Sequence, residues 1–561
     1  MSLSVVYTRA NIGIDAPLVT IEVHLSNGLP GFQLVGLPET TVKESRDRVR
    51  SALINAGFEF PSKKIVVNMA PADLPKGGAR FDLAIAIGII AAHEKLDVTA
   101  LEQYEFVGEL ALSGELRSIH GALPMACAVA KSGRTLILPQ ANANEGALVS
   151  NACVLSAKQL FDVYLHLTGK KQLVVASAEQ AQSPGFGHVY GHGEGEGEGD
   201  DGEGDRHANN DNQESEHSTP YGDIKDIIDQ QHAKRALEIS ACGGHNLLFF
   251  GPAGTGKSML ASRLLSIMPD LSLEDALTVA SIRSISGESI DAKNWRQRPF
   301  RQPHHSSSGA AIVGGGAYPK PGEITLAHKG VLFLDELPEF GRHVLDVMRE
   351  PLETGEINLS RAAHKVSYPA DFQLIAAMNP SPTGDVDDKR SNADQILRYL
   401  NRISGPLLDR IDLQVNVPRV NLARSLQFES DITNTDTKTK TSSKQSEEVK
   451  ERNSQVTESS AQVKERVVKT QDIQLARQGV LNKALNNQQI KQHCGLSGAN
   501  QKFITHAIDT LGLSMRAYHR TLKVARTIAD MQSSPNIEQN HIAEALSFRS
   551  FDRLLHQLTN S

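Results

Sequence analysis

A glycine-rich turn between a short apolar run and a helical pattern constrains this chain more than any other feature. The run HNLLFF (245–250) leads into GPAGTGKS (251–258), and MLASRLLSIM (259–268) then places apolar residues at helical spacing. Glycines allow successive N–H groups to point at one anion, and the helix N-terminus adds positive partial charge. This strand, turn and helix predict a site for the phosphates of a nucleoside triphosphate, formed by Gly251, Pro252, Ala253, Gly254, Thr255, Gly256, Lys257 and Ser258.

Two acids follow a second apolar run, GVLFLDELPEF (330–340). Its lack of alternation indicates a strand buried on both faces, as in a central parallel sheet, where ligands bind at the carboxyl ends of the strands. We expect Lys257 to reach the β/γ oxygens, and Ser258 and Asp335 to hold Mg²⁺. Glu336 is the candidate that polarises the attacking water.

Further polar residues follow the next apolar strand and the C-terminal helical patterns. Asn379 ends DFQLIAAMNP and could orient water, although an asparagine before proline is also a common turn former. Phosphoryl transfer gains from an arginine at the γ-phosphate, and RYLNRISGPLLDRIDL offers Arg402 and Arg410. A surface ion pair is the alternative for Arg410. In the last helical segment the candidate is Arg516, with Arg520 and Arg526 as rivals.

The chain of 561 residues is too long for one core and divides by composition. Residues 1–170 show mixed strand and helix patterns. Residues 171–220 become glycine alternating with acid, and 421–465 turn to Ser, Thr, Lys, Glu and Gln, so both are expected to be disordered. Residues 221–420 carry the nucleotide motifs, and 466–561 read as all-helical.

Charge and cysteine usage limit the classes of partner and compartment. Ten acids and one arginine between residues 191 and 220 account for more than the whole net charge of −7, so the remaining chain is close to neutral. A nucleic-acid partner therefore stays open. Four cysteines stand singly, which argues against a CxxC zinc site and for a reducing, cytoplasmic location. No apolar run is long enough to cross a membrane.

Long, idiosyncratic segments resemble the YifB/ComM family of magnesium-chelatase-like AAA+ ATPases. They are RPFRQPHHSSSGAAIVGGGAYPKPGEITLAHKGVLFLDELPEF (298–340), AAMNPSPTG, RYLNRISGPLLDRIDL, LSMRAYHRTLKVARTIADM and, near the N-terminus, GLPGFQLVGLPETTVKESRDRVRSAL and APADLPKGGARFDLAIAIG. The resemblance implies an α/β Lon-protease-like (S5 domain 2-like) N-terminal domain, an AAA+ core with a central parallel sheet, and an all-helical lid.

The same resemblance implies roles and an activity. Asn379 would be sensor 1, Arg410 the arginine finger acting on a neighbouring subunit, and Arg516 sensor 2. ATP and Mg²⁺ would be the cofactors. The family implies a homo-hexamer that drives branch migration of DNA during natural transformation.

Departures from related patterns exclude two activities. Where Lon carries its nucleophilic serine this chain has Arg80, and IHGALP (119–124) offers no lysine base, so we expect no peptidase activity. The stretch after Pro380 lacks the cysteine cluster of some relatives, so no zinc is expected. His304 and His305 have no acid or cysteine at ligand spacing, which favours structural hydrogen bonding over a metal site.

The segment GEINLSRAAHKV (355–366) reads as a hairpin between the strands that end at Asp335 and Asn379. In the ring ATPases that this chain resembles, the hairpin before sensor 1 carries basic side chains into the pore. By that resemblance the basic tip, Arg361, His364 and Lys365, is the predicted contact to the phosphates of branched or single-stranded DNA, and a plain solvated hairpin is the alternative. Two other functions stay open, a magnesium-chelatase motor subunit and a protein-remodelling ATPase. No D-x-S-x-S metal-adhesion motif supports the first.

Overall fold

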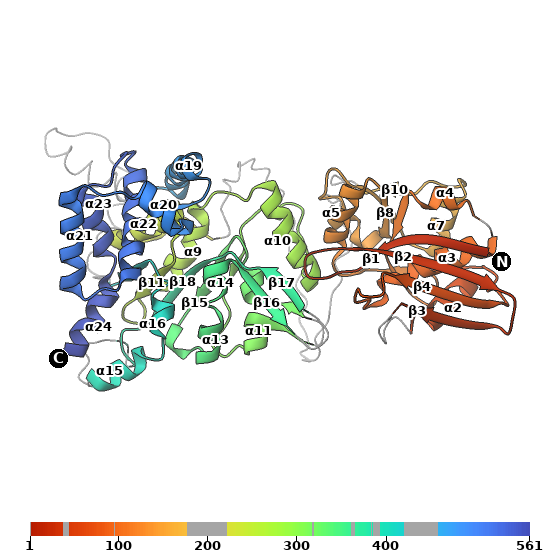
Figure 1. Cartoon of the computed structure of the whole chain (residues 1–561), viewed down its shortest axis with the longest axis horizontal. Coiled ribbons are helices and arrows are strands. Elements are labelled where there is room, and N and C mark those ends of the chain that lie inside the picture. Colours follow the sequence, from red (N-terminus) through yellow and green to blue (C-terminus); the bar gives the residue numbers. More distant parts are fainter. Residues whose placement is uncertain are drawn as a thin grey trace, which may run out of the picture.

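The computed structural model describes residues 2–36, 44–94, 96–176, 221–316, 319–360, 365–382, 384, 393–419 and 458–560. Three parts follow one another along the long axis of the molecule (Figure 1). An N-terminal domain, residues 2–176, lies at one end. The core domain, residues 221–419, lies in the middle, and the C-terminal helices lie at the other end.

The N-terminal domain is built on a mixed sheet in the order β10-β9-β8-β5-β1-β2-β4-β3. Strands β1 and β2 pair antiparallel, as do β2 and β4, whereas β5, β8 and β9 run parallel. Alternating burial along β2 and β4 shows that one face of the sheet is covered. The strands are β1 (Ser2–Arg9), β2 (Leu18–Ser26), β3 (Gly31–Val35), β4 (Lys64–Ala70), β5 (Tyr104–Phe106), β8 (Thr135–Pro139), β9 (Cys153–Ala157) and β10 (Val174–Val175).

Helix α3 (Asp82–Glu94) fills the core of this domain, because every residue from Asp82 to Ala92 is buried. It packs against β1 and β2. The apolar segment FDLAIAIGIIAA therefore forms a helix that is covered on all sides. The remaining elements are α2 (Ser45–Asn55), α4 (Val98–Leu101), β6 (Glu109–Leu110), β7 (Leu116–Arg117), α5 (Ala122–Ser132), α6 (Ala143–Gly146) and α7 (Leu160–Leu167).

The core domain contains a five-stranded sheet in the order β12-β15-β18-β11-β19, and every neighbouring pair is parallel. All residues of β11, β15 and β18 are buried, which explains their unbroken apolar sequences. The predicted central parallel sheet is confirmed. Its strands are β11 (Leu247–Phe250), β12 (Phe300–Arg301), β15 (Val331–Leu334), β18 (Gln373–Met378) and β19 (Leu413–Asn416).

Two insertions of the core lie beside each other. The first, which we name the insert, runs from α11 (Gly309–Val313) to α12 (Glu323–Leu326) and includes the paired strands β13 (Gly314–Gly315) and β14 (Lys320–Pro321). The second, which we name the hairpin, is β16 (Glu356–Ser360) with β17 (Lys365–Pro369). The Tyr368 hydroxyl donates to the carbonyl of Pro319 at 2.8 Å and joins the two.

Helices surround the core sheet and form the C-terminal part. The core helices are α8 (Gln231–Gly243), α9 (Lys257–Ile267), α10 (Leu273–Ser286), α13 (Arg342–Val347), α14 (Pro351–Thr354), α15 (Ala393–Leu400) and α16 (Gly405–Leu408), with the 3-10 turn η5 (Leu337–Glu339). The C-terminal part consists of α19 (Ser460–Gln478), η6 (Asn482–Ala484), α20 (Asn487–His493), α21 (Gly498–Leu511), α22 (Met515–Met531), α23 (Gln539–Ser547) and α24 (Ser550–Asn560).

The start of the C-terminal part corrects one predicted boundary. Helix α19 begins at Ser460, with a capping box between Ser459 and Gln462, so residues 460–465 are helical rather than part of the insertion predicted for 421–465. Residues 421–457 of that insertion and 177–220 of the predicted linker lie outside the described residues. No helix in the described part of the chain is long and apolar enough to cross a membrane.

Candidate nucleotide site

The predicted phosphate loop lies at the carboxyl end of β11, and two glycines give it its shape. Gly254 (φ 77°) and Gly256 (φ 84°) occupy the left-handed region, which glycine adopts at least cost. Helix α9 begins directly after them at Lys257, so the unpaired N–H groups of its first turn face the loop. A cavity of about 410 Å³ lies at the loop and is lined by residues of the loop, by Asp335 and Glu336, and by Met378 and Asn379.

Lys257 lies folded beneath the loop and is almost fully buried. Its ammonium donates to the carbonyls of Gly251 and Pro252, both at 2.8 Å, and to Oδ1 of Asn379 at 3.2 Å. Burial lowers the pKa of Lys257, and the charges of the two acids after β15 oppose that shift. The lysine and the predicted sensor asparagine therefore meet at one point, where a phosphate oxygen could replace the present acceptors.

The two residues predicted to hold Mg²⁺ are brought together from different elements. The Ser258 hydroxyl, in the first turn of α9, donates to Oδ2 of Asp335 at 2.8 Å. The other carboxylate oxygen of Asp335 accepts from the backbone N–H of Glu336 at 3.0 Å. A hydroxyl and a carboxylate are oxygen ligands of the kind that Mg²⁺ takes beside nucleotide phosphates, so this pair fits the ion.

Glu336 has a backbone conformation that is rare for a residue with a side chain, φ 53° and ψ 50°. Its Oε2 lies 3.3 Å from Nδ1 of His305, and 52% of its side chain is exposed. His304, by contrast, contacts the hydroxyl of Ser306 at 2.7 Å. Structural hydrogen bonds were predicted for both histidines, and the contact of His305 with the candidate catalytic glutamate was not predicted.

No signal in the sequence pairs His305 with Glu336, because they are 31 positions apart. They meet because β12 and β15 are neighbours in the sheet and the segments after both strands leave at the same edge. In the described residues, no group of three or more histidine, cysteine or acidic side chains is arranged to hold a metal ion.

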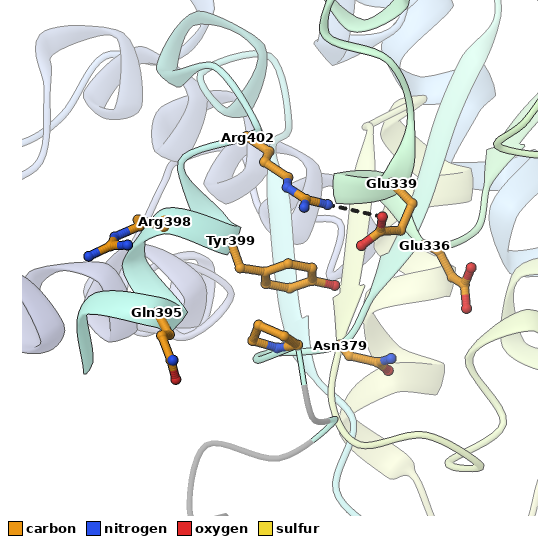
Figure 2. A pocket seen from close by; sticks show the side chains of 8 residues that line it. Glu336, Glu339, Asn379, Gln395, Arg398, Tyr399 and Arg402 are labelled. Atoms are coloured by element: carbon orange, nitrogen blue, oxygen red, sulfur yellow. Dashed lines mark hydrogen bonds and ion pairs between the residues drawn. The ribbon is translucent and has the colours of Figure 1, made fainter. Parts of the chain in front are cut away.

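A second cavity, of about 500 Å³, shares Glu336 and Asn379 with the first and extends to α15. Figure 2 shows Arg402 on the α15 side, where its Nη1 lies 2.9 Å from Oε2 of Glu339. Tyr399 lies beside it, and burial raises the pKa of this tyrosine to about 12. Arg402 therefore belongs to the same sheet edge as the phosphate loop of its own chain.

Arg410 lies at the opposite edge of the sheet. It precedes β19, which runs parallel to β11, and the N–H groups of Asp412 and Leu413 donate to the carbonyl of Asn246 at the start of β11. Four strand residues span about 13 Å, so Arg410 and the phosphate loop of the same chain are separated by the length of the sheet. The two candidate arginines thus occupy opposite edges.

The surroundings of Arg410 explain how it is held. Only 7% of the residue is exposed. Its guanidinium pairs with Glu353, donates to the carbonyl of Pro406 at 2.5 Å, and has its pKa lowered by burial, which Glu353 opposes. Glu353 was not predicted as its partner.

Arg516 lies near Arg410 and not at the phosphate loop of its own chain. Its Nη1 is 3.5 Å from Oδ2 of Asp409, the residue before Arg410, and 67% of its side chain is exposed. The two rivals on α22 have structural partners. Arg520 pairs with the buried Asp412 at 2.5 Å, and Arg526 pairs with Asp530 at 3.0 Å.

The predicted DNA-contact residues are described only in part. Lys365 begins β17 and is exposed, opposite Ser360 in the register of the hairpin. Arg361 and His364 lie outside the described residues. The predicted hairpin itself is confirmed by β16 and β17.

Comparisons with known proteins match all three parts of the chain. A family profile for "Magnesium chelatase, subunit ChlI" covers residues 223–425, one for "Subunit ChlI of Mg-chelatase" covers 21–142, and one for "Magnesium chelatase, subunit ChlI C-terminal" covers 457–549. Competence protein ComM of Haemophilus influenzae is 50% identical over 562 residues and covers all of both chains.

One further relative matches the whole chain, and another matches a part of it. Uncharacterized protein YifB of Escherichia coli is 48% identical over 560 residues, covering this whole chain and 99% of its own. Lon protease 2 of Bacillus subtilis is 27% identical over an alignment of 205 residues, and the match covers 28% of this chain and 33% of that protein. With these likenesses, the parallel-sheet core and the helical C-terminal part, the chain belongs to the YifB/ComM family of magnesium-chelatase-like AAA+ ATPases.

Proposed function

We propose that this protein hydrolyses ATP as a homo-hexamer and uses the energy to move along branched or single-stranded DNA, promoting branch migration during natural transformation or recombination in the cytoplasm. The observation that carries the proposal is the convergence of Lys257, Ser258, Asp335 and Asn379 on one cavity at the phosphate loop. The full-length match, at 50% identity, to a relative named a competence protein supports DNA as the polymer along which the protein moves.

In this proposal each residue of the site has one task. The backbone of Gly251–Ser258 and the Lys257 ammonium bind the phosphates, and Asn379 orients the attacking water. Ser258 and Asp335 would hold Mg²⁺, which neutralises charge on the phosphate oxygens when bound. Glu336, held by His305 at 3.3 Å, accepts the proton of the water.

Arg410 and Arg516 would complete the site of a neighbouring subunit. Their position at the far sheet edge supports this assignment, because within one chain they are remote from the phosphate loop. A guanidinium supplied in trans stabilises the charge that develops on the transferred phosphoryl group. Arg402, at the edge of its own loop, is the weaker candidate for that role.

The division of labour along the chain follows the predicted domains, with residues 1–170 as an inactive Lon-like domain, 221–420 as the motor and the C-terminal helices as the lid. The hairpin would grip DNA through Lys365 and the neighbouring Arg361 and His364. Contacts of cations to phosphates are independent of base sequence and weaken with salt, as a translocating motor requires.

The test compares ATP turnover with and without forked DNA in the wild type and in a variant with Arg361→Ala and Lys365→Ala. We expect DNA to stimulate the wild type and not the variant, with basal turnover equal in both. In single-stranded DNA binding, the slope of log affinity against log salt should become less negative by about 1.4, from ~0.7 for each of two lost phosphate contacts.

A variant with Lys491→Ala and Lys502→Ala removes two exposed lysines from the C-terminal helices and serves as the control. Stimulation that survives loss of Arg361 and Lys365 would refute the role of the hairpin.

The match of all three parts to chelatase subunit profiles favours a second candidate, a motor that remodels a protein partner. Wild-type turnover that forked DNA leaves unchanged would select that alternative.

A further inference from the structure

Among the described residues, the N-terminal domain contacts the ATPase core at two places of different character. The first is an apolar packing of α5 against α10, in which Ala122, Ala126 and Ala280 share one buried cluster. The N–H of Gly121 also donates to the carbonyl of Ser284 at 3.1 Å. This contact attaches the domain to the helix that follows α9.

The second contact is a tight turn that joins β1 to β2 and reaches the hairpin (Figure 1). Ile12 and Asp15 exchange two backbone hydrogen bonds of 2.9 and 3.0 Å, so Gly13 and Ile14 form a two-residue turn. Gly13 has φ 61°, the left-handed conformation that such turns require. The turn is therefore a rigid tip at the end of two strands.

The tip fits closely onto strand β17. A Cβ added to Gly13 would lie 2.9 Å from Cγ1 of Val366 and 3.3 Å from the carbonyl oxygen of Ser367, so no side chain fits between them. The partly buried Ile12 and Ile14 pack against the apolar cluster that contains Val366. The contact lies one residue from Lys365, at the end of the hairpin proposed to grip DNA.

The apolar face of the hairpin thus contacts two other segments of the chain. Ile357, Leu359, Val366 and Tyr368 are buried, whereas Lys365 and Ser367 on the alternate positions are exposed. The insert contacts the hairpin at Tyr368 through Pro319, and the turn of the N-terminal domain contacts it at Val366 and Ser367. An isolated two-stranded hairpin is marginally stable in water, so these two contacts stabilise the position of β16 and β17.

We propose that the turn Ile12–Asp15 supports the hairpin through its contact with β17, a contact that we name the bearing. We further propose that the N-terminal domain is a positioning element that couples ATP turnover to DNA movement. The coupling half of the inference rests on the proposed function. The support of the hairpin by the turn does not depend on that function. Through this contact the Lon-like domain has a mechanical task that needs none of the catalytic residues of a peptidase.

The test places a side chain in the contact. Gly13→Val inserts a branched side chain against Val366, and Gly133→Val is the matched control, since Gly133 (φ 70°) lies in the same domain with nothing within 4 Å of an added Cβ. In hydrogen exchange, we expect the β16 and β17 amides to exchange at least tenfold faster in Gly13→Val than in Gly133→Val. Equal exchange in the two variants would overturn the bearing.

A second measurement addresses the coupling. Gly13→Val is expected to keep basal ATP turnover within twofold of wild type and to lose at least fivefold of the stimulation by forked DNA, while Gly133→Val keeps that stimulation. Full stimulation in Gly13→Val would overturn the coupling. If the wild type itself is not stimulated by DNA, the proposed function fails, and the exchange result still decides the bearing. Ile14→Ser, which removes an apolar contact without crowding β17, should reproduce both effects if Gly13→Val fails to fold.

Discussion

Replacing Asp412 by asparagine should destabilise the ATPase core far more than the same change at Asp409. Both acids flank Arg410 and both pair with an arginine of α22. Asp412 is buried, lies 2.5 Å from Arg520 Nη1, and accepts from the N–H of Asn246 at 3.1 Å. Asp409 is 3.5 Å from Arg516, whose side chain is two-thirds exposed. The two positions therefore compare a buried ion pair with a surface one.

The structure sets the expected size of each effect. Removing one partner of a buried pair costs about 3 to 5 kcal/mol, and we expect about 3 because a quarter of the Arg520 side chain is in contact with water. For a unit of this size that corresponds to a fall in Tm of about 6 to 12 °C. A surface pair contributes about 0 to 1 kcal/mol, so Asp409→Asn should lower Tm by less than about 4 °C.

The assay is scanning calorimetry of wild type and both variants, since apolar residues of the core sheet and of α22 share one buried cluster and should unfold together.

Burial alone would raise the pKa of Asp412, but Arg520 and His245 together lower it. A group with a lowered pKa stabilises the fold above its unfolded pKa, about 3.9, and loses that contribution as the pH falls. The Tm difference between wild type and Asp412→Asn should therefore shrink below about pH 4. Equal Tm values for Asp412→Asn and Asp409→Asn at pH 7 would refute the reasoning.

Two further predictions concern the nucleotide site. Lys257→Ala and Arg410→Ala should each lower ATP turnover at least 100-fold. Mixing the two inactive proteins should restore part of the turnover, because some sites then combine an intact phosphate loop with an intact arginine of the neighbouring subunit. A mixture that stays inactive would place Arg410 outside a shared site. His305→Ala should lower ATP turnover about fivefold, since it removes about 1 kcal/mol of contact that orients the half-exposed Glu336. His304→Ala, which removes the contact to Ser306, should leave turnover unchanged. A larger loss of turnover in His304→Ala than in His305→Ala would show that the contact of His305 with Glu336 is only structural.

The placement of most candidate nucleotide-site residues was predictable because they are local in sequence. The loop, Lys257 and Ser258 are contiguous, and the burial of β15 on both faces is recorded in an unbroken apolar run. Asp335 and Asn379 were predicted to follow strand ends, which a parallel sheet brings to one edge. These predictions needed only the direction of each strand and no knowledge of the strand order.

Contacts across the sheet order could not be predicted in this way. The meeting of His305 with Glu336 depends on β12 lying next to β15, and that of Arg410 with Glu353 on how α14 and α16 approach each other. Neither pair shares a periodic pattern or a spacing rule. The eight-stranded order of the N-terminal domain is likewise a result of its crossovers, since the strand patterns alone are compatible with several orders.

The position of Arg410 has a consequence for assembly. Within one chain its charge is already satisfied by Glu353 and by the carbonyl of Pro406, and little of the residue is exposed. To act on the nucleotide of a neighbour, Arg410 must exchange Glu353 for a phosphate, and Glu353, which is 60% exposed, can then be solvated. An arginine held by a solvent-accessible acid is released at little cost, whereas one paired with a buried acid, as Arg520 is with Asp412, is not. Of the arginines at this edge of the sheet, Arg410 and the exposed Arg516 are therefore suited to leave their partners, and Arg520 is suited to hold the segment that carries them.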